Sequence, residues 1–192
     1  MLSYQEINNI IKGKLSYNRY RHTLGVINSA VELSEIHGEN RNSARLAALI
    51  HDISKDIDNV EQINLANKYK IEIDKISAAQ PSLLHGIIGS YIAKNNFGII
   101  DREILNAIKY HTTGRANMSK LEKIIYLADY IEEGRNFPGL DTIRRIVKEN
   151  LDQAMLLALD NSIQYIIQKQ KLIHPLTIEA RNDILHKMYY NN

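Results

Sequence analysis

Six side chains that could bind a metal ion occur where the helical pattern predicts buried apolar residues. They are His22, His51, Asp52, His85, His111 and Asp129. His51, for example, follows Ala47 by about one helical turn, and Asp129 follows Ile125 by the same spacing. An unpaired carboxylate on an apolar helix face is costly in free energy. Something must therefore compensate the negative charge of Asp52 and of Asp129.

Together, four imidazoles and two carboxylates would suit a site for two divalent or trivalent metal ions. Imidazole is a good ligand for iron and zinc, and carboxylate also accepts harder ions. The charge of the metal would offset the buried anions. On one helix, His51 and Asp52 would project about 100° apart, so a shared metal would have to lie between them. A single histidine on an apolar face is more often a hydrogen-bonded core residue, so this prediction depends on the joint pattern.

The elements that must position these residues are helical almost throughout the chain. Ser3 with Glu6 and Ser119 with Glu122 predict two capping boxes at helix starts. The spacing of apolar residues predicts helices at about 4–13, 17–37, 42–52, 59–70, 81–98, 101–111 and 119–131, then from 141 to about 171 with a break near 150–152, and a last helix ending near 188. The prediction is a single all-α domain over residues 1–192, a bundle of roughly nine or ten helices.

Composition excludes several classes of function. The chain has 24 basic and 22 acidic residues, so its charge gives no reason to expect a nucleic-acid or membrane partner. The best basic segment, residues 143–148, is short and followed by Glu149. Cysteine is absent, which excludes disulfides and thiolate metal sites. The N-terminal residues do not look like a signal peptide, and we expect a cytoplasmic protein.

The ordered series of His22, the His51–Asp52 pair, His85, His111 and Asp129 resembles the HD-domain phosphohydrolase superfamily. Further segments resemble its YqeK-type branch of symmetrical bis(5'-nucleosyl)-tetraphosphatases: RYRHTLGV, AALIHDISKD, LLHGIIGSYIAK, AIKYHTTG, IIYLADYIEEGRNFPG and KLIHP. One departure is Glu133, where the branch often has proline. Arg135 still stands at the expected place.

The resemblance implies hydrolysis of dinucleoside tetraphosphates, typically diadenosine tetraphosphate, to two nucleoside diphosphates, with iron as the cofactor and manganese or another divalent ion as an alternative. It implies that His22, His51, Asp52 and Asp129 hold one metal. His85 and His111 would hold a second ion bridged by Asp52, or would contact phosphate. With Asp52, the expected catalytic residues are Lys55, His85 and His111.

The resemblance also implies residues that contact the substrate. Lys55 follows Asp52 by three positions, which would place its ammonium on the metal side of a continuing helix. Guanidinium groups bind phosphate well. The expected substrate-binding residues are Arg19, Lys55, Thr112, Arg135, Ile173, His174 and Pro175. The metal-binding core would span about 18–135, helices at about 141–190 would complete the nucleotide site, and the protein would be a homodimer.

Two alternatives remain open at this point. The same metal site could act on another nucleotide, such as a nucleoside monophosphate or a deoxynucleoside triphosphate. The chain could also be a non-catalytic sensor that binds metal and nucleotide without turnover. A substrate panel separates the first alternative from the tetraphosphatase, and a turnover assay with added iron or manganese tests the second.

Overall fold

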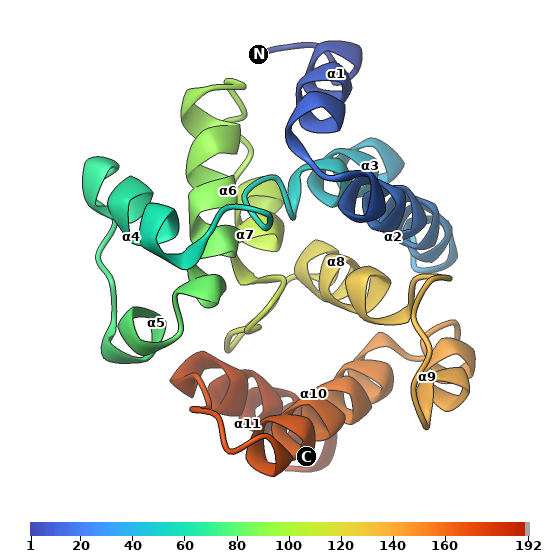
Figure 1. Cartoon of the computed structure of the whole chain (residues 1–192). Coiled ribbons are helices and arrows are strands. Elements are labelled where there is room, and N and C mark those ends of the chain that lie inside the picture. The colour runs from blue at the N-terminus through green and yellow to red at the C-terminus, as the bar shows by residue number, and fades with distance from the viewer. Residues whose placement is uncertain (191–192) are drawn as a thin grey trace.

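The computed structural model describes residues 1–190, and within them the chain forms eleven α-helices, one short 3₁₀-helix and no strand (Figure 1). The elements are α1 (Tyr4–Lys14), α2 (Tyr17–Ile36), α3 (Arg41–Ile50), α4 (Asn59–Lys68), α5 (Lys75–Ala79), η1 (Pro81–Leu83), α6 (Leu84–Asn95), α7 (Arg102–Tyr110), α8 (Lys120–Ile131), α9 (Leu140–Ile146), α10 (Leu151–Gln168) and α11 (Pro175–Tyr189). The predicted all-α class is confirmed, and the number of helices is close to the prediction. No helix among the described residues is both long and apolar enough to cross a bilayer.

Local sequence signals explain most of the helix starts. Both predicted capping boxes are present: Ser3 with Glu6 begins α1, and Ser119 with Glu122 begins α8. In each, the serine hydroxyl accepts a hydrogen bond from the glutamate N–H, and the glutamate carboxylate accepts one from the serine N–H. These bonds satisfy donors that the first helical turn leaves free.

Two details differ from the prediction. The helix α5 was not predicted, because its five residues are too few for a periodic apolar pattern. The helix predicted over 42–52 ends at Ile50, and tight turns follow in which Ile53 donates to Ile50 and Lys55 donates to Asp52. His51 is the C-cap of α3. His51 and Asp52 therefore lie just after the last residue of α3, and their side chains do not project from the side of a helix.

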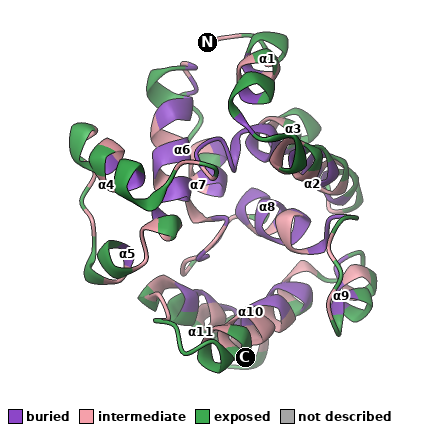
Figure 2. Cartoon of the chain, in the orientation of Figure 1, coloured by how far each residue is buried: buried purple, intermediate pink, exposed green. Residues whose placement is uncertain are grey.

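Helix α8 lies at the centre of the bundle and carries much of the core. It packs against α2, α3, α7 and α10, while α6 packs on α7 and α10 pairs with α11. Figure 2 shows α8 and the facing sides of α3 and α6 as largely buried. Ile124, Ile125 and Leu127 on α8 are fully enclosed. This arrangement brings α2, α3, α6, α7 and α8, which carry the six predicted ligands, around one point.

Candidate functional site

The six residues singled out from the sequence meet in one group, called here the His–Asp cluster. It consists of His22 on α2, His51 and Asp52 after α3, His85 on α6, His111 at the end of α7, and Asp129 on α8. Its first and last members, His22 and Asp129, are more than a hundred positions apart in the sequence. The packing of the helices brings them together.

Asp52 lies at the centre of the cluster. Its Oδ1 is 3.3 Å from Nε2 of His85 and 3.5 Å from Nε2 of His111. Its Oδ2 is 3.4 Å from Nε2 of His51 and 3.7 Å from Nε2 of His22. Each oxygen of this carboxylate thus faces two of the four imidazoles. Such an arrangement suits a carboxylate that lies between two cations.

Asp129 completes the other end of the cluster, where its Oδ1 is 3.1 Å from Nε2 of His22. One ligand atom each from His22, His51 and Asp129 lies within 4.8 Å of the other two, and the same holds for His51, Asp52 and His111. The cluster therefore contains two overlapping sets of three potential ligands that share His51.

Three of the imidazoles are oriented by backbone carbonyls three residues earlier in the chain. Nδ1 of His51 lies 2.7 Å from the Ala48 carbonyl, Nδ1 of His85 lies 2.5 Å from that of Ser82, and Nδ1 of His111 lies 2.7 Å from that of Ile108. A carbonyl accepts only, so each Nδ1 must donate. In the neutral ring, Nε2 then carries a lone pair that points into the cluster.

The orientation of these rings fits a metal site. The Nε2 atoms of His22 and His51 are buried and have no hydrogen-bond partner. The Nε2 atoms of His85 and His111, both expected to carry lone pairs, lie 3.0 Å apart. Lone pairs that converge on two carboxylates suit a cation, and Nδ1–H bonds of this kind are what orients histidine ligands in metal sites. The residues present therefore suit a metal ion bound by nitrogen and oxygen.

The surroundings of both carboxyl groups in the cluster favour their ionised form. Burial alone would raise the pKa of the Asp52 carboxyl, but the imidazoles of His51, His111 and His85 outweigh burial and hold this pKa well below its usual range. Burial likewise opposes ionisation of Asp129, yet His22 and His51 lower its pKa. Both carboxylates are therefore anionic at neutral pH and available to a cation.

The pKa of His85 shifts in the opposite sense, and this predicts a pH dependence of stability. Burial, then Lys55 and His111, lower the pKa of His85 to about 4, against the pull of Asp52. Because an unfolded histidine has a pKa of about 6.5, the unfolded chain binds this proton between about pH 6.5 and 4 while the folded chain does not. His85 should therefore reduce the free energy of unfolding by about 3 kcal/mol as the pH falls through this window.

Urea denaturation of the chelator-treated protein between pH 7 and 4 measures this effect. His85→Gln should show a shallower loss of stability than the wild type over the window. His186→Gln, a change at an exposed histidine of α11, should keep the wild-type slope. Equal slopes for His85→Gln and the wild type would contradict the assignment.

The predicted cationic helpers also lie at the cluster. Arg19 donates to Oδ2 of Asp52 at 2.9 Å, and Arg135 donates to Oδ1 of Asp129 at 2.6 Å. Nζ of Lys55 lies 3.4 Å from Nε2 of His85. Burial lowers the pKa of Lys55, although Asp52 and Asp129 partly restore it. The hydroxyl of Thr112 lies 3.1 Å from Nε2 of both His85 and His111.

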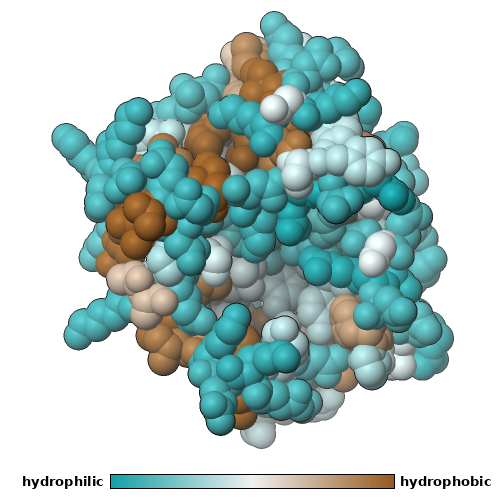
Figure 3. All heavy atoms as spheres, viewed as in Figure 1, coloured by the Kyte–Doolittle hydropathy of each residue, from teal (hydrophilic) through white to brown (hydrophobic). Residues whose placement is uncertain are grey.

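The described residues of the cluster are unevenly exposed to solvent. The side chains of His51, His85 and His111 are at most 1% exposed, whereas those of Asp129 and Arg135 are 22% and 41% exposed. Among the described residues, the cluster is therefore more open to solvent near Asp129 and Arg135 than at the three histidines. On the face drawn in Figure 3, a hollow near the middle has hydrophilic residues along its rim.

The predicted segment Ile173–Pro175 contacts the start of α5 through His174. His174 is the N-cap of α11, Pro175 is its first residue, and Nε2 of His174 lies 3.3 Å from Oδ2 of Asp74. His174 and Thr112 line one cavity of about 190 Å³, together with Asp74 and other residues of α5 to α7. None of the six cluster residues lines this cavity, nor do Ile173 and Pro175, and the cavity reaches the cluster only through Thr112, whose hydroxyl contacts His85 and His111.

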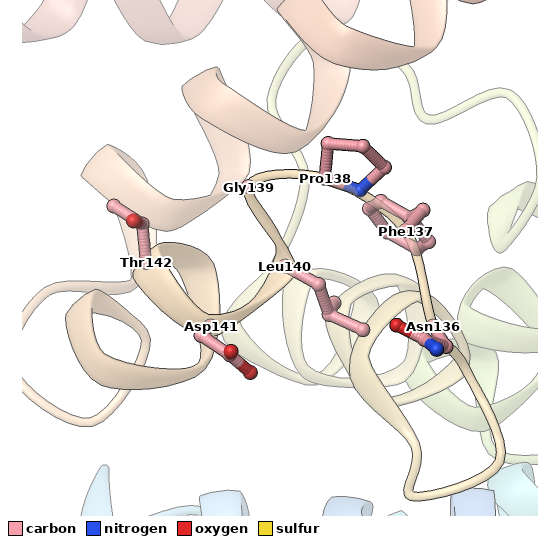
Figure 4. A pocket seen from close by; sticks show the side chains of 7 residues that line it. All are labelled: Asn136, Phe137, Pro138, Gly139, Leu140, Asp141 and Thr142. Carbon is pink, nitrogen blue, oxygen red and sulfur yellow. The ribbon is translucent and has the colours of Figure 1, made fainter.

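A second hollow lies on the loop after Arg135 and contains none of the cluster. Figure 4 shows its lining from Asn136 to Thr142, with Phe137, Pro138 and Leu140 among them. Asp141 is its one carboxylate, and Gly139 makes the turn with a φ of +86°. This lining offers no group of metal ligands.

Sequence reasoning missed two residues that support the site. Glu132 is 4% exposed, and its Oε1 lies 3.2 Å from Nδ1 of His22. Arg144, part of the basic segment considered above, donates to the carbonyls of Ile131, Glu132 and Arg135 at 3.0, 2.9 and 3.2 Å. A sequence pattern cannot distinguish this buried glutamate from the exposed Glu133 beside it.

The sequence of this chain is similar to one protein family and to several proteins that share one name. The HD domain family matches residues 19–134. Proteins named symmetrical bis(5'-nucleosyl)-tetraphosphatase from Halalkalibacterium halodurans and Bacillus subtilis are 40% and 37% identical to this chain, covering 92% and 90% of it and 94% and 92% of their own lengths. The protein of that name from Staphylococcus aureus is 35% identical, over 99% of this chain and 95% of its own.

A crystal structure from Clostridium acetobutylicum has the same fold. It is described as a predicted HD superfamily hydrolase involved in NAD metabolism. It matches with a TM-score of 0.94 and 43% identity, covering 97% of this chain and 99% of its own. The matched family region contains the whole His–Asp cluster, from His22 to Asp129. This chain therefore belongs to the HD domain family.

Proposed function

We propose that this chain is a metal-dependent hydrolase that cleaves dinucleoside tetraphosphates, such as diadenosine tetraphosphate, symmetrically into two nucleoside diphosphates. The observation that carries the proposal is the convergence of four oriented imidazoles on Asp52. The names of relatives that match over most of the chain supply the substrate class.

In this proposal His22, His51, Asp52 and Asp129 would hold the first metal. His85 and His111, together with Asp52, would hold a second ion, or would contact a phosphate. When bound, the metal would act as a Lewis acid and would lower the pKa of the water that it binds towards about 7. Iron is the proposed metal, with manganese or another divalent ion as the alternative. The mixed imidazole and carboxylate donors support this choice.

The chain's own cations bind and orient the tetraphosphate. Arg19 and Arg135 stand at the more exposed side of the cluster, where their guanidinium groups can exchange a carboxylate partner for a phosphate. Lys55 and Thr112 lie deeper, against His85, and place a cation and a hydroxyl donor at the reacting phosphate. These groups stabilise the negative charge that develops on phosphoryl oxygens in the transition state.

The proposed organisation is one domain over residues 1–192. The core at about 18–135 carries the metal ligands, and the helices at about 141–190 complete the nucleotide site through Ile173, His174 and Pro175. The cavity lined by both Thr112 and His174 supports this role. A homodimer acting in the cytoplasm is also part of the proposal, and both points rest on the resemblance described from the sequence.

Product analysis tests the function. The protein is incubated with diadenosine tetraphosphate and Fe²⁺, with Mn²⁺ in a parallel reaction, and the nucleotides are separated by chromatography. ADP as the sole product is expected. ATP together with AMP would contradict symmetric cleavage. An intact tetraphosphate, tested beside nucleoside monophosphates and deoxynucleoside triphosphates, would overturn the proposal in favour of another substrate or of a sensor.

A further inference from the structure

We propose that Glu132 is a positioning residue that fixes the tautomer of His22, so that the lone pair of Nε2 points into the His–Asp cluster. The inference rests on the proposed function only for its effect on metal binding. The protonation site of His22 is a property of the chain itself and can be measured without metal.

His22 needs a partner that the other three histidines do not. His51 and His111 lie at helix ends, and His85 lies just after η1, where backbone carbonyls are free to accept from Nδ1. His22 lies within the 20-residue helix α2, whose interior carbonyls accept from the helix backbone. Among the four imidazoles, His22 is the one whose Nδ1 faces a side chain. That side chain belongs to Glu132, which is 110 residues further along the chain.

The two oxygens of Glu132 have separate partners. Oε2 accepts a hydrogen bond from the backbone N–H of Gly134 at 2.6 Å, and Oε1 lies 3.2 Å from Nδ1 of His22. An ionised carboxylate can only accept, so the proton of the neutral imidazole is drawn to Nδ1. Oδ1 of Asp129 lies 3.1 Å from Nε2 of His22, but Nε2 has no hydrogen-bond partner, and this oxygen already accepts from Arg135 at 2.6 Å. The hydrogen-bond geometry therefore leaves Nε2 without a proton.

The surroundings of Glu132 hold its carboxylate in this position. A Cβ on Gly25 would lie 2.6 Å from Oε2 of Glu132, and a Cβ on Gly134 would lie 3.0 Å from both oxygens. A methyl group at Gly25 would therefore displace the carboxylate, and one at Gly134 would crowd both of its oxygens. Arg144 fixes the backbone on either side of it through the carbonyls of Ile131, Glu132 and Arg135. A buried carboxylate held this closely has a defined orientation towards His22.

Glu132→Gln gives a specific expectation. The Gly134 N–H can only donate, so the single oxygen of the glutamine amide should turn to it. The NH₂ group would then face Nδ1 of His22, and two donors would oppose each other unless the imidazole moved its proton to Nε2. We expect the tautomer of His22 to change and the affinity for Mn²⁺ to fall by about 10- to 100-fold, the range for lost partners of histidine ligands.

Two measurements test the inference. The first is ¹⁵N NMR of the histidine rings in the chelator-treated protein, with the His22 signals assigned from a His22→Gln variant. The second is titration of the full chain with Mn²⁺. Wild type should show a proton on Nδ1 of His22, and Glu132→Gln should show it on Nε2 with weaker Mn²⁺ binding. Glu133→Gln makes the same chemical change at the exposed neighbouring residue and should match wild type in both measurements.

Gly25→Ala provides a second route if Glu132→Gln does not fold. Its methyl group should displace the Glu132 carboxylate and weaken Mn²⁺ binding, while Gly13→Ala, where a Cβ meets nothing within 4 Å, should not. Wild-type protein with the Nε2–H tautomer would overturn the inference, as would either Glu132→Gln or Gly25→Ala with wild-type tautomer and Mn²⁺ affinity. Absence of tetraphosphate hydrolysis by wild type would overturn only the proposed function.

Discussion

Replacing Asp52 with asparagine should abolish hydrolysis and metal binding together. Asp52 is 2% exposed and faces all four imidazoles of the cluster. The amide loses the negative charge and replaces one oxygen with an NH₂ group that cannot ligate. Since this carboxylate stands where both proposed ions would meet, we expect turnover to fall by about 10³-fold or more, the scale for losing a central electrostatic group.

Steady-state ADP production and the metal content of the purified protein measure this change, with circular dichroism to verify folding. Asp141→Asn is the matched control, because the Asp141 side chain is 97% exposed and lies outside the cluster. It should retain wild-type turnover and metal. A folded Asp52→Asn protein that keeps its metal and most of its activity would show that Asp52 is not the central ligand.

Gly86→Ala should destabilise the packing of α6 on α7. Helices α6 and α7 approach so closely at this glycine that a Cβ would lie 2.6 Å from the carbonyl oxygen of Lys109 and 3.3 Å from that of Ile108. Backbone atoms cannot turn aside as a side chain can, so the helices must move apart. We expect the free energy of unfolding to fall by about 1–3 kcal/mol, as for other overpacked positions.

The same change should also reduce activity. Gly86 follows His85, and the close approach of α6 to α7 holds the Nε2 atoms of His85 and His111 3.0 Å apart. A displacement of about 1 Å can cost about 10²-fold in rate. Urea denaturation and ADP production measure the two effects. Gly13→Ala, in a helix with open space around the glycine, should be neutral or stabilising, and an equal result for both variants would refute the argument.

The position of His51 and His111 at helix ends explains how their imidazole rings are oriented. A helix leaves its last carbonyls without intrahelical donors, and the Ala48 and Ile108 carbonyls at the ends of α3 and α7 accept from imidazole Nδ1 atoms instead. The short turns after α3 then direct Asp52 back towards the same point. Each helix end thus supplies both a ligand and the group that orients it.

Much of the fold could be predicted from local sequence. The capping boxes at Ser3 and Ser119 and the apolar spacing fixed the class and most helix positions, because both depend on residues only a few positions apart. The exceptions have the same physical origin. Helix α5 is too short for a period to be visible, and the end of α3 depends on tight turns that no spacing pattern indicates.

The residue types of the His–Asp cluster could be predicted from the amino-acid sequence, because six polar side chains on apolar helix faces need a common explanation. Their arrangement could not, because it depends on contacts between helices in the folded chain. The tertiary structure placed both oxygens of Asp52 between pairs of imidazoles, and it buried Glu132 against His22 while leaving Glu133 exposed. These contacts join residues as many as 110 positions apart. They depend on how helices pack, which no local pattern in the chain records.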